Sequence, residues 1–117
     1  MIYDIFIVPL IMLICGFLMY KHPPKKINFF VGYRTKKSMK NKINWKKANI
    51  YSGKIMLITG IATTIISIII LILELLNIIR ITDEILVVII LIQLLTLSVP
   101  IILTEKKLKE KSLWKNI

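Results

Sequence analysis

The chain has 117 residues, of which 56% are hydrophobic, and it carries a formal net charge of +11. A soluble domain of this size exposes too much surface to bury so many Ile and Leu side chains. The apolar residues also run in blocks of about 20, the length of a membrane span, rather than in amphipathic stripes. These properties exclude an ordinary soluble domain and indicate one small membrane domain over residues 1–117.

The first apolar block covers residues 2–20 and contains one charged residue, Asp4. A signal peptide would have basic residues before the block and a small-residue cleavage site after it. Here the basic residues follow, starting at Lys21, and no such site is evident. We therefore expect a retained membrane helix rather than a cleaved leader.

Two further blocks, 55–73 and 85–103, are also long enough to cross about 30 Å of hydrocarbon. The predicted fold is therefore an all-α membrane protein with three transmembrane helices. Pro9 in the first span and Pro100 in the third predict kinks, which neighbouring helices can tolerate by bonding the freed carbonyls. Gly53 and Gly60 predict a close contact between helices.

Polar residues within the second and third spans are few and uncharged: Thr59, Thr63, Thr64, Ser67, Gln93, Thr96 and Ser98. Gln93 falls near the bilayer midplane, level with residues 63–67, so we predict an interhelical hydrogen bond of about 0.6–2 kcal/mol. A proton or ion path needs ionisable groups at depth, and these spans have none there. The sequence therefore disfavours a transporter.

The distribution of Lys and Arg predicts the orientation. The loop 21–54 has eleven Lys or Arg and no acidic residue, the loop 74–84 has one Arg and three acidic residues, and the tail 104–117 has five Lys and two Glu. Loops rich in Lys and Arg stay in the cytoplasm. We expect the N-terminus outside, the first loop and the C-terminal tail inside, and the protein in a bacterial plasma membrane.

The first loop mixes apolar, aromatic and basic residues, and Gly32 offers a point where the backbone can turn. Ser38 is a candidate N-cap for a helix that continues through 41–53 into the second span. On that helix, spacings of three and four place five residues on one face, which we expect to pack on the bundle: Trp45, Ala48, Asn49, Ser52 and Met56. Six lysines are expected to face lipid headgroups: Lys36, Lys37, Lys40, Lys42, Lys46 and Lys47.

Several of these residues form a recognisable pattern. The element N-x-x-x-G-Y-R-T precedes S-M, then W-x-x-A-N, then a Gly that enters a membrane helix. The residues that carry it are Asn28, Gly32, Tyr33, Arg34, Thr35, Ser38, Trp45, Asn49 and Gly53. The pattern, from about Pro23 to Leu73, resembles the SdpI family of bacterial membrane proteins. Longer members carry extra spans before the motif, whereas this chain has one.

The resemblance implies a function. The family is named for an immunity protein that protects a cell from its own secreted, membrane-active peptide toxin. That protein also acts as a receptor that holds a transcriptional repressor at the membrane. The implied partners of this chain are a peptide toxin outside, a repressor inside and anionic lipid of the inner leaflet, and a homo-oligomer fits the thin bundle. Within the motif, we expect Arg34 to pair with Asn28, Asn49 or the carbonyls around Gly32.

Other functions remain to be weighed. A structural or lipid-binding protein without toxin specificity would explain the lysines, since each contributes about 1 kcal/mol near an anionic surface. Nucleic acid is a more distant polyanion for a loop between two spans. No nucleophile–base pair or metal-ligand set occurs in the loop, so we expect no enzyme, metal or cofactor.

Overall fold

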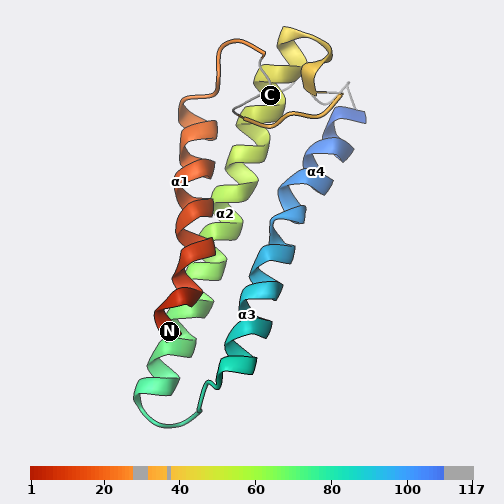
Figure 1. Ribbon diagram of the computed structural model, residues 1–117. Coiled ribbons are helices and arrows are strands. Elements are labelled where there is room, and N and C mark those ends of the chain that lie inside the picture. Colours follow the sequence, from red (N-terminus) through yellow and green to blue (C-terminus); the bar gives the residue numbers. More distant parts are fainter. Residues whose placement is uncertain (28–31, 37, 110–117) are drawn as a thin grey trace.

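The computed structural model describes residues 1–27, 32–36 and 38–109, which form an elongated helical bundle of 52 × 26 × 22 Å (Figure 1). It contains three helical stretches that are long and apolar enough to cross a membrane: Ile2–Lys21, Lys42–Leu75 and Asp83–Lys109. No strand occurs in the described ranges. The predicted all-α fold with three membrane-capable helices is confirmed.

The first stretch begins with a short 3-10 helix, η1 (Ile2–Phe6), which continues directly as α1 (Ile7–Lys21). Pro9 lies in the first turn of α1, just after the change from 3-10 to α geometry. Because proline has no N–H, it cannot bond the carbonyl of Ile5, four residues earlier. That carbonyl is left available to partners from other helices.

The second stretch is a single helix, α2 (Lys42–Leu75), so the predicted helix within the first loop and the second span are continuous. The predicted N-cap at Ser38 is wrong. Asn41 has extended backbone angles, and its side chain accepts a 2.8 Å hydrogen bond from the Asn44 N–H, which makes it the N-cap. Ser38 instead opens a short 3-10 turn, η2 (Ser38–Lys40), because its hydroxyl is bonded within the loop.

The third stretch is divided into α3 (Asp83–Thr96) and α4 (Ser98–Lys109). Pro100 cannot donate to the carbonyl of Thr96, which removes one bond from the helical series. The interruption falls at Leu97, whose N–H makes a 3.2 Å bond to the Leu94 carbonyl, three residues back. The distortion predicted from Pro100 is therefore present.

Helices α1 and α2 make the closest contact in the bundle. A Cβ on Gly53 would lie 2.6 Å from the Tyr20 backbone nitrogen, and one on Gly16 would lie 2.7 Å from the Leu57 nitrogen. A Cβ on Gly60 would lie 3.1 Å from that of Met12. The predicted close approach at Gly53 and Gly60 is confirmed, and Gly16 completes it from the facing helix.

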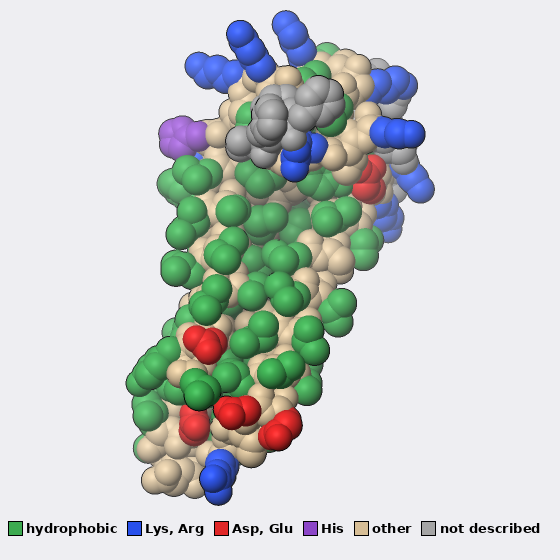
Figure 2. Space-filling view, viewed as in Figure 1, with side chains coloured by type: hydrophobic (Ala, Val, Ile, Leu, Met, Phe, Trp, Pro, Cys, Tyr) green, Lys and Arg blue, Asp and Glu red, His purple; other side chains and the backbone are tan. Residues whose placement is uncertain are grey.

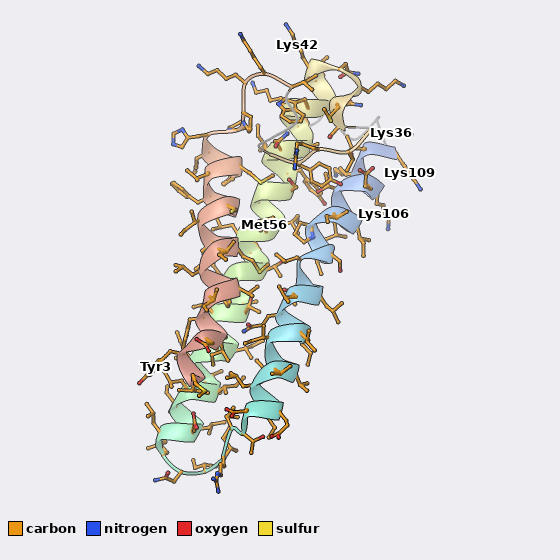
Figure 3. All side chains as sticks on the ribbon, viewed as in Figure 1. Tyr3, Lys36, Lys42, Met56, Lys106 and Lys109 are labelled. Atoms are coloured by element: carbon orange, nitrogen blue, oxygen red, sulfur yellow. The ribbon has the colours of Figure 1, made fainter. Side chains whose placement is uncertain are left out.

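Charge separates along the bundle. In Figure 2, Lys and Arg side chains gather at the end where α2 begins, while most Asp and Glu side chains lie towards the other end. Figure 3 places Lys36, Lys42, Lys106 and Lys109 at the first end and Tyr3 towards the other. We call these the basic end and the acidic end. The sides between them expose many Ile and Leu side chains, as a lipid-facing surface requires.

Candidate functional site at the basic end

Trp45, in the first turn of α2, fixes the chain that leaves α1. Its side chain is 1% exposed, and its indole N–H donates a 2.7 Å hydrogen bond to the carbonyl of Pro24. Neither Pro23 nor Pro24 has an N–H with which to continue α1, and the chain that follows is not helical, so the Pro24 carbonyl has no helical donor. Trp45 supplies that donor together with a large buried ring.

Asn49, one turn further along α2, holds the middle of the loop. Its side-chain oxygen accepts a 2.6 Å hydrogen bond from the Tyr33 N–H, and its amide donates 2.8 Å to the Trp45 carbonyl. The side chain is fully buried. The adjacent Gly32 has a φ of +99° and packs its backbone against the Asn49 side-chain oxygen, so a Cβ there would collide with it.

Thr35 and Ser38 close the next turn with reciprocal bonds. The Thr35 N–H donates to the Ser38 hydroxyl over 2.8 Å, and the Ser38 N–H donates to the Thr35 hydroxyl over 3.2 Å. The Ser38 hydroxyl also lies within donating distance of the carbonyls of Thr35 and Tyr33, at 2.9 and 3.1 Å. These bonds satisfy an irregular backbone that neither helix nor sheet could satisfy.

Tyr33 joins the loop to α4. Its ring is buried in a small apolar cluster with Ala48 and Leu108, flanked by Met19 and Tyr51. Its hydroxyl lies 3.0 Å from a carboxylate oxygen of Glu105 and 3.2 Å from the Ile101 carbonyl. One side chain of the loop therefore contacts helices from each of the three membrane-capable stretches.

The protonation state of Tyr33 follows from these contacts. Burial raises the pKa of its phenol above the usual value near 10, the hydrogen bond to Glu105 and the negative charge of Glu105 raise it further, and Thr35 acts weakly in the other direction. The phenol is therefore protonated at neutral pH and serves as a hydrogen-bond donor to α4.

The structure brings together most of the residues in the predicted motif. Gly32, Tyr33, Thr35 and Ser38 lie in the loop, and Trp45 and Asn49 bond its backbone. Gly53, one turn further along α2, packs against α1. The predicted face of α2 is buried at Trp45, Ala48, Asn49 and Ser52 and half-buried at Met56. Asn28 lies outside the described residues.

Arg34 differs from the expectation. Its side chain is exposed, whereas the Asn49 side chain bonds the backbone of Tyr33 and Trp45. The expected pairing of Arg34 with Asn49 is therefore not what holds the loop. Arg34 instead stands at the rim of a hollow of about 370 Å³, beside Gly32, Thr35 and Pro100.

The predicted lipid-facing lysines are placed as follows. Lys36, Lys40, Lys42 and Lys46 are exposed, Lys47 is half-buried, and Lys37 lies outside the described residues. No group of three or more His, Cys, Asp or Glu side chains able to hold a metal occurs in the described ranges.

Sequence reasoning missed Glu105. The Tyr33 and Glu105 positions are 72 residues apart, and nothing in the periodicity of either segment pairs them. The available signal is compositional, because Glu105 is an acidic residue at the start of a basic tail. A carboxylate among lysines more often forms a surface ion pair than a buried contact, so this signal predicts an ion pair and not the bond to Tyr33.

A second polar cluster lies deep in the bundle. The Gln93 amide donates 2.8 Å to the Ile5 carbonyl and 3.0 Å to the Ser67 hydroxyl, which itself lies 3.2 Å from the Ile5 carbonyl. The predicted interhelical bond of Gln93 is confirmed. Both donors bond the carbonyl that Pro9 leaves free, which explains why the helix tolerates a proline here.

The fold and these contacts define a helical, multi-pass membrane protein with a folded, basic loop between its first two membrane-capable stretches. Residues 25–104 match the model of the SdpI/YfhL protein family, so this chain belongs to that family. It is 43% identical over 51 residues to the "Uncharacterized protein YfhL" of Bacillus subtilis (strain 168). That match covers 44% of this chain and 46% of YfhL, less than half of the relative's length. No solved structure matches the chain.

Proposed function

We propose that this protein is an immunity or sensing protein of the bacterial plasma membrane, directed at a secreted, membrane-active peptide toxin. Its basic end faces the cytoplasm, where the loop passes the toxin-bound state to a repressor. Membership of the SdpI/YfhL family supports this proposal, because the family is named for an immunity protein. The proposal concerns this chain, since the matched relative is itself uncharacterised.

The charge asymmetry supports the orientation. Loops rich in Lys and Arg are retained in the cytoplasm, which favours an orientation with the basic end inside and the acidic end outside. Glu74, Asp83 and Glu84 then face the exterior, where a cationic peptide would meet them. Like long-range steering in other complexes, this attraction would raise the rate of encounter more than the final affinity.

The observation that carries the proposal is the bond between Tyr33 and Glu105. The regular helix of the third stretch is interrupted at Leu97, between α3 and α4. A toxin that displaces α3 from its partners would change the position of α4, and α4 holds the loop through the Tyr33 hydroxyl. Such an arrangement gives two states, with the loop bound to α4 or released, which a cytoplasmic partner can distinguish.

The test is protection from killing. A toxin-sensitive bacterium that expresses the chain should survive a peptide toxin encoded beside it, as measured by survival against toxin concentration. Tyr33→Phe should lose signalling to the repressor while retaining the protein in the membrane. Tyr20→Phe, which changes an interfacial tyrosine outside the loop, is the matched control. Unchanged killing with every co-encoded peptide, despite normal expression, would exclude the immunity role.

The second candidate is a structural or anionic-lipid-binding protein without toxin specificity. The exposed lysines Lys36, Lys40, Lys42 and Lys46 favour it. It predicts that Lys→Gln substitutions abolish activity, whereas Asn49→Ala and Arg34→Lys leave it unchanged. The immunity proposal predicts the opposite order, because the folded loop depends on Asn49 and not on any single exposed lysine.

A further inference from the structure

A basic hollow of about 570 Å³ lies at the basic end, on a side of α2 that the folded loop does not line. Helices α1, α2 and α4 all contribute to it. The lining residues are Tyr20, Lys46, Lys47, Ile50, Tyr51, Lys54 and Lys107. None of these residues is acidic, so within the described part of the chain four lysines and no carboxylate line this hollow.

The residues from α2 form one stripe. Lys47, Tyr51 and Lys54 follow at i, i+4 and i+7, which places them on the same face of the helix. Lys107 reaches the hollow from α4, where its ammonium lies over the Tyr51 ring, 5.6 Å from the centroid. Glu105, two residues earlier on α4, is engaged by Tyr33 and does not line the hollow.

The hollow extends to the edge of the hydrocarbon. Along the helix axis, Lys54 lies about 10 Å deeper than Lys47, at 1.5 Å per residue. Lys54 is exposed, and segment 55–73, which has no charged residue, begins immediately after it. An ammonium at this depth is costly unless it reaches the interface or meets an anion. Tyr20 and Ile50 supply apolar wall beside it.

We propose that this hollow binds the phosphate of an anionic glycerophospholipid from the adjacent leaflet. Lys54 and Lys107 contact the phosphate, Tyr51 offers a hydroxyl or ring edge, and the lipid's glycerol and first acyl carbons lie along Ile50 and Tyr20. A phosphate ester is the shared chemistry of a lipid headgroup and a soluble phosphate. The depth of Lys54 and the apolar wall select the lipid. The inference does not rest on the proposed role in immunity.

This site differs from general attraction between lysines and a charged surface. General attraction treats every exposed lysine alike, at about 1 kcal/mol each. A defined site concentrates the effect on Lys54 and Lys107. Lys36 and Lys40 are exposed at the same end but do not line this hollow, so together they give a control with the same change in net charge.

The experiment is a lipid titration of the full chain in detergent, followed by native mass spectrometry. Phosphatidylglycerol should bind as one saturable adduct, and phosphatidylcholine should bind far more weakly. The double variant of Lys54→Gln and Lys107→Gln should weaken phosphatidylglycerol binding about tenfold or more, whereas that of Lys36→Gln and Lys40→Gln should weaken it less than about twofold. The conservative variant Lys107→Arg should retain binding.

Two outcomes would overturn the proposal. Equal losses in the two double variants would mean general electrostatic attraction without a site. Full displacement of the lipid by millimolar glycerol 3-phosphate would mean that the hollow recognises soluble phosphate rather than lipid. Circular dichroism of each variant checks the fold. If the glutamine variants unfold, the stoichiometry of phosphatidylglycerol binding to the wild-type chain and its competition with glycerol 3-phosphate still decide the test, because general attraction gives no single saturable adduct. If the wild-type chain binds the lipid at this site but gives no protection from any co-encoded toxin, the immunity role alone is contradicted.

Discussion

Two groups of buried polar side chains stabilise this protein, and they act on different kinds of backbone. The polar cluster of Ile5, Ser67 and Gln93 satisfies one carbonyl that Pro9 leaves free within an otherwise regular helix. At the basic end, Trp45 and Asn49 hold a stretch of chain that has no regular structure of its own. The first group supplies the hydrogen bond that a helix lacks, whereas the second determines the conformation of the loop. Loss of the first group should lower the free energy of unfolding only slightly, whereas loss of the second should release the whole loop.

The largest effect is expected from Asn49→Ala. This change removes the acceptor for the Tyr33 N–H and the support for the backbone turn at Gly32, and it leaves buried backbone groups without partners. We expect a loss of about 2–4 kcal/mol in the free energy of unfolding, because unsatisfied buried groups keep their full desolvation cost. Thermal unfolding in detergent measures this loss, and limited trypsin digestion at Lys25 and Lys36 measures release of the loop.

Ser52→Ala is the matched control for Asn49→Ala. Ser52 is also fully buried on α2, but its hydroxyl makes a local 3.4 Å contact to the Asn49 carbonyl. We expect less than about 1 kcal/mol of destabilisation and an unchanged trypsin pattern. If both variants released the loop equally, the loop would depend on packing of α2 rather than on the Asn49 side chain.

Gln93→Leu, which removes the polar cluster's main donor, should cost less than Asn49→Ala. Interhelical hydrogen bonds in membranes average about 0.6 kcal/mol and reach about 1.7 kcal/mol. Ser67 still reaches the Ile5 carbonyl at 3.2 Å, so the carbonyl keeps one donor. The expected result is a modest fall in thermal stability with trypsin cleavage of the loop unchanged. Increased cleavage of the loop in this variant would show that the polar cluster and the loop unfold as one cooperative unit.

Sequence reasoning was most reliable where one physical rule acts locally. Hydrophobic length identified the three membrane-capable stretches, proline chemistry located the break before Pro100, and helical spacing identified the buried face of Trp45 and Asn49. It failed where the outcome depends on distant pairs. That the Asn49 side-chain oxygen would accept from the Tyr33 N–H depends on how the loop packs on α2, and that Tyr33 would meet Glu105 depends on how α4 packs. The periodicity of these segments encodes neither contact.

The start of α2 illustrates the same limit on a smaller scale. Ser38 and Asn41 are both good N-cap residues, and the local sequence does not rank them. The Ser38 hydroxyl is taken by the Thr35 turn, so Asn41 caps the helix instead. A competing hydrogen bond within the loop decided between two acceptable N-cap residues.

Tyr33→Phe should have an effect of about 0.5–1.5 kcal/mol, the usual range for one hydrogen bond, because the buried ring is retained. Its effect should also depend on pH. The pKa of Tyr33 is higher in the folded protein than in the unfolded chain, so its contribution is present in full below pH 10 or thereabouts and is lost as the pH rises further. The difference in stability between wild type and Tyr33→Phe should therefore shrink above that pH.

Comparison of the two proteins is essential, because the pH-dependent contributions that they share cancel in the difference. A difference that stayed constant from pH 8 to pH 11 would mean that neither burial nor the bond to Glu105 raises the pKa of the phenol. The result bears directly on the proposed function, because that bond is the link between the loop and α4.

Arg34→Lys should have the smallest effect on stability, below about 0.5 kcal/mol, because the side chain is exposed. The variant nevertheless distinguishes the structural role of the loop from its function. If Asn49 and its partners only build a scaffold, an exposed arginine beside that scaffold is free to contact a partner through planar, multi-donor bonds that lysine cannot copy. The expected result is normal stability and normal trypsin resistance with reduced protection from toxin or reduced signalling. Protection equal to wild type would instead place the function of the loop in its backbone shape alone.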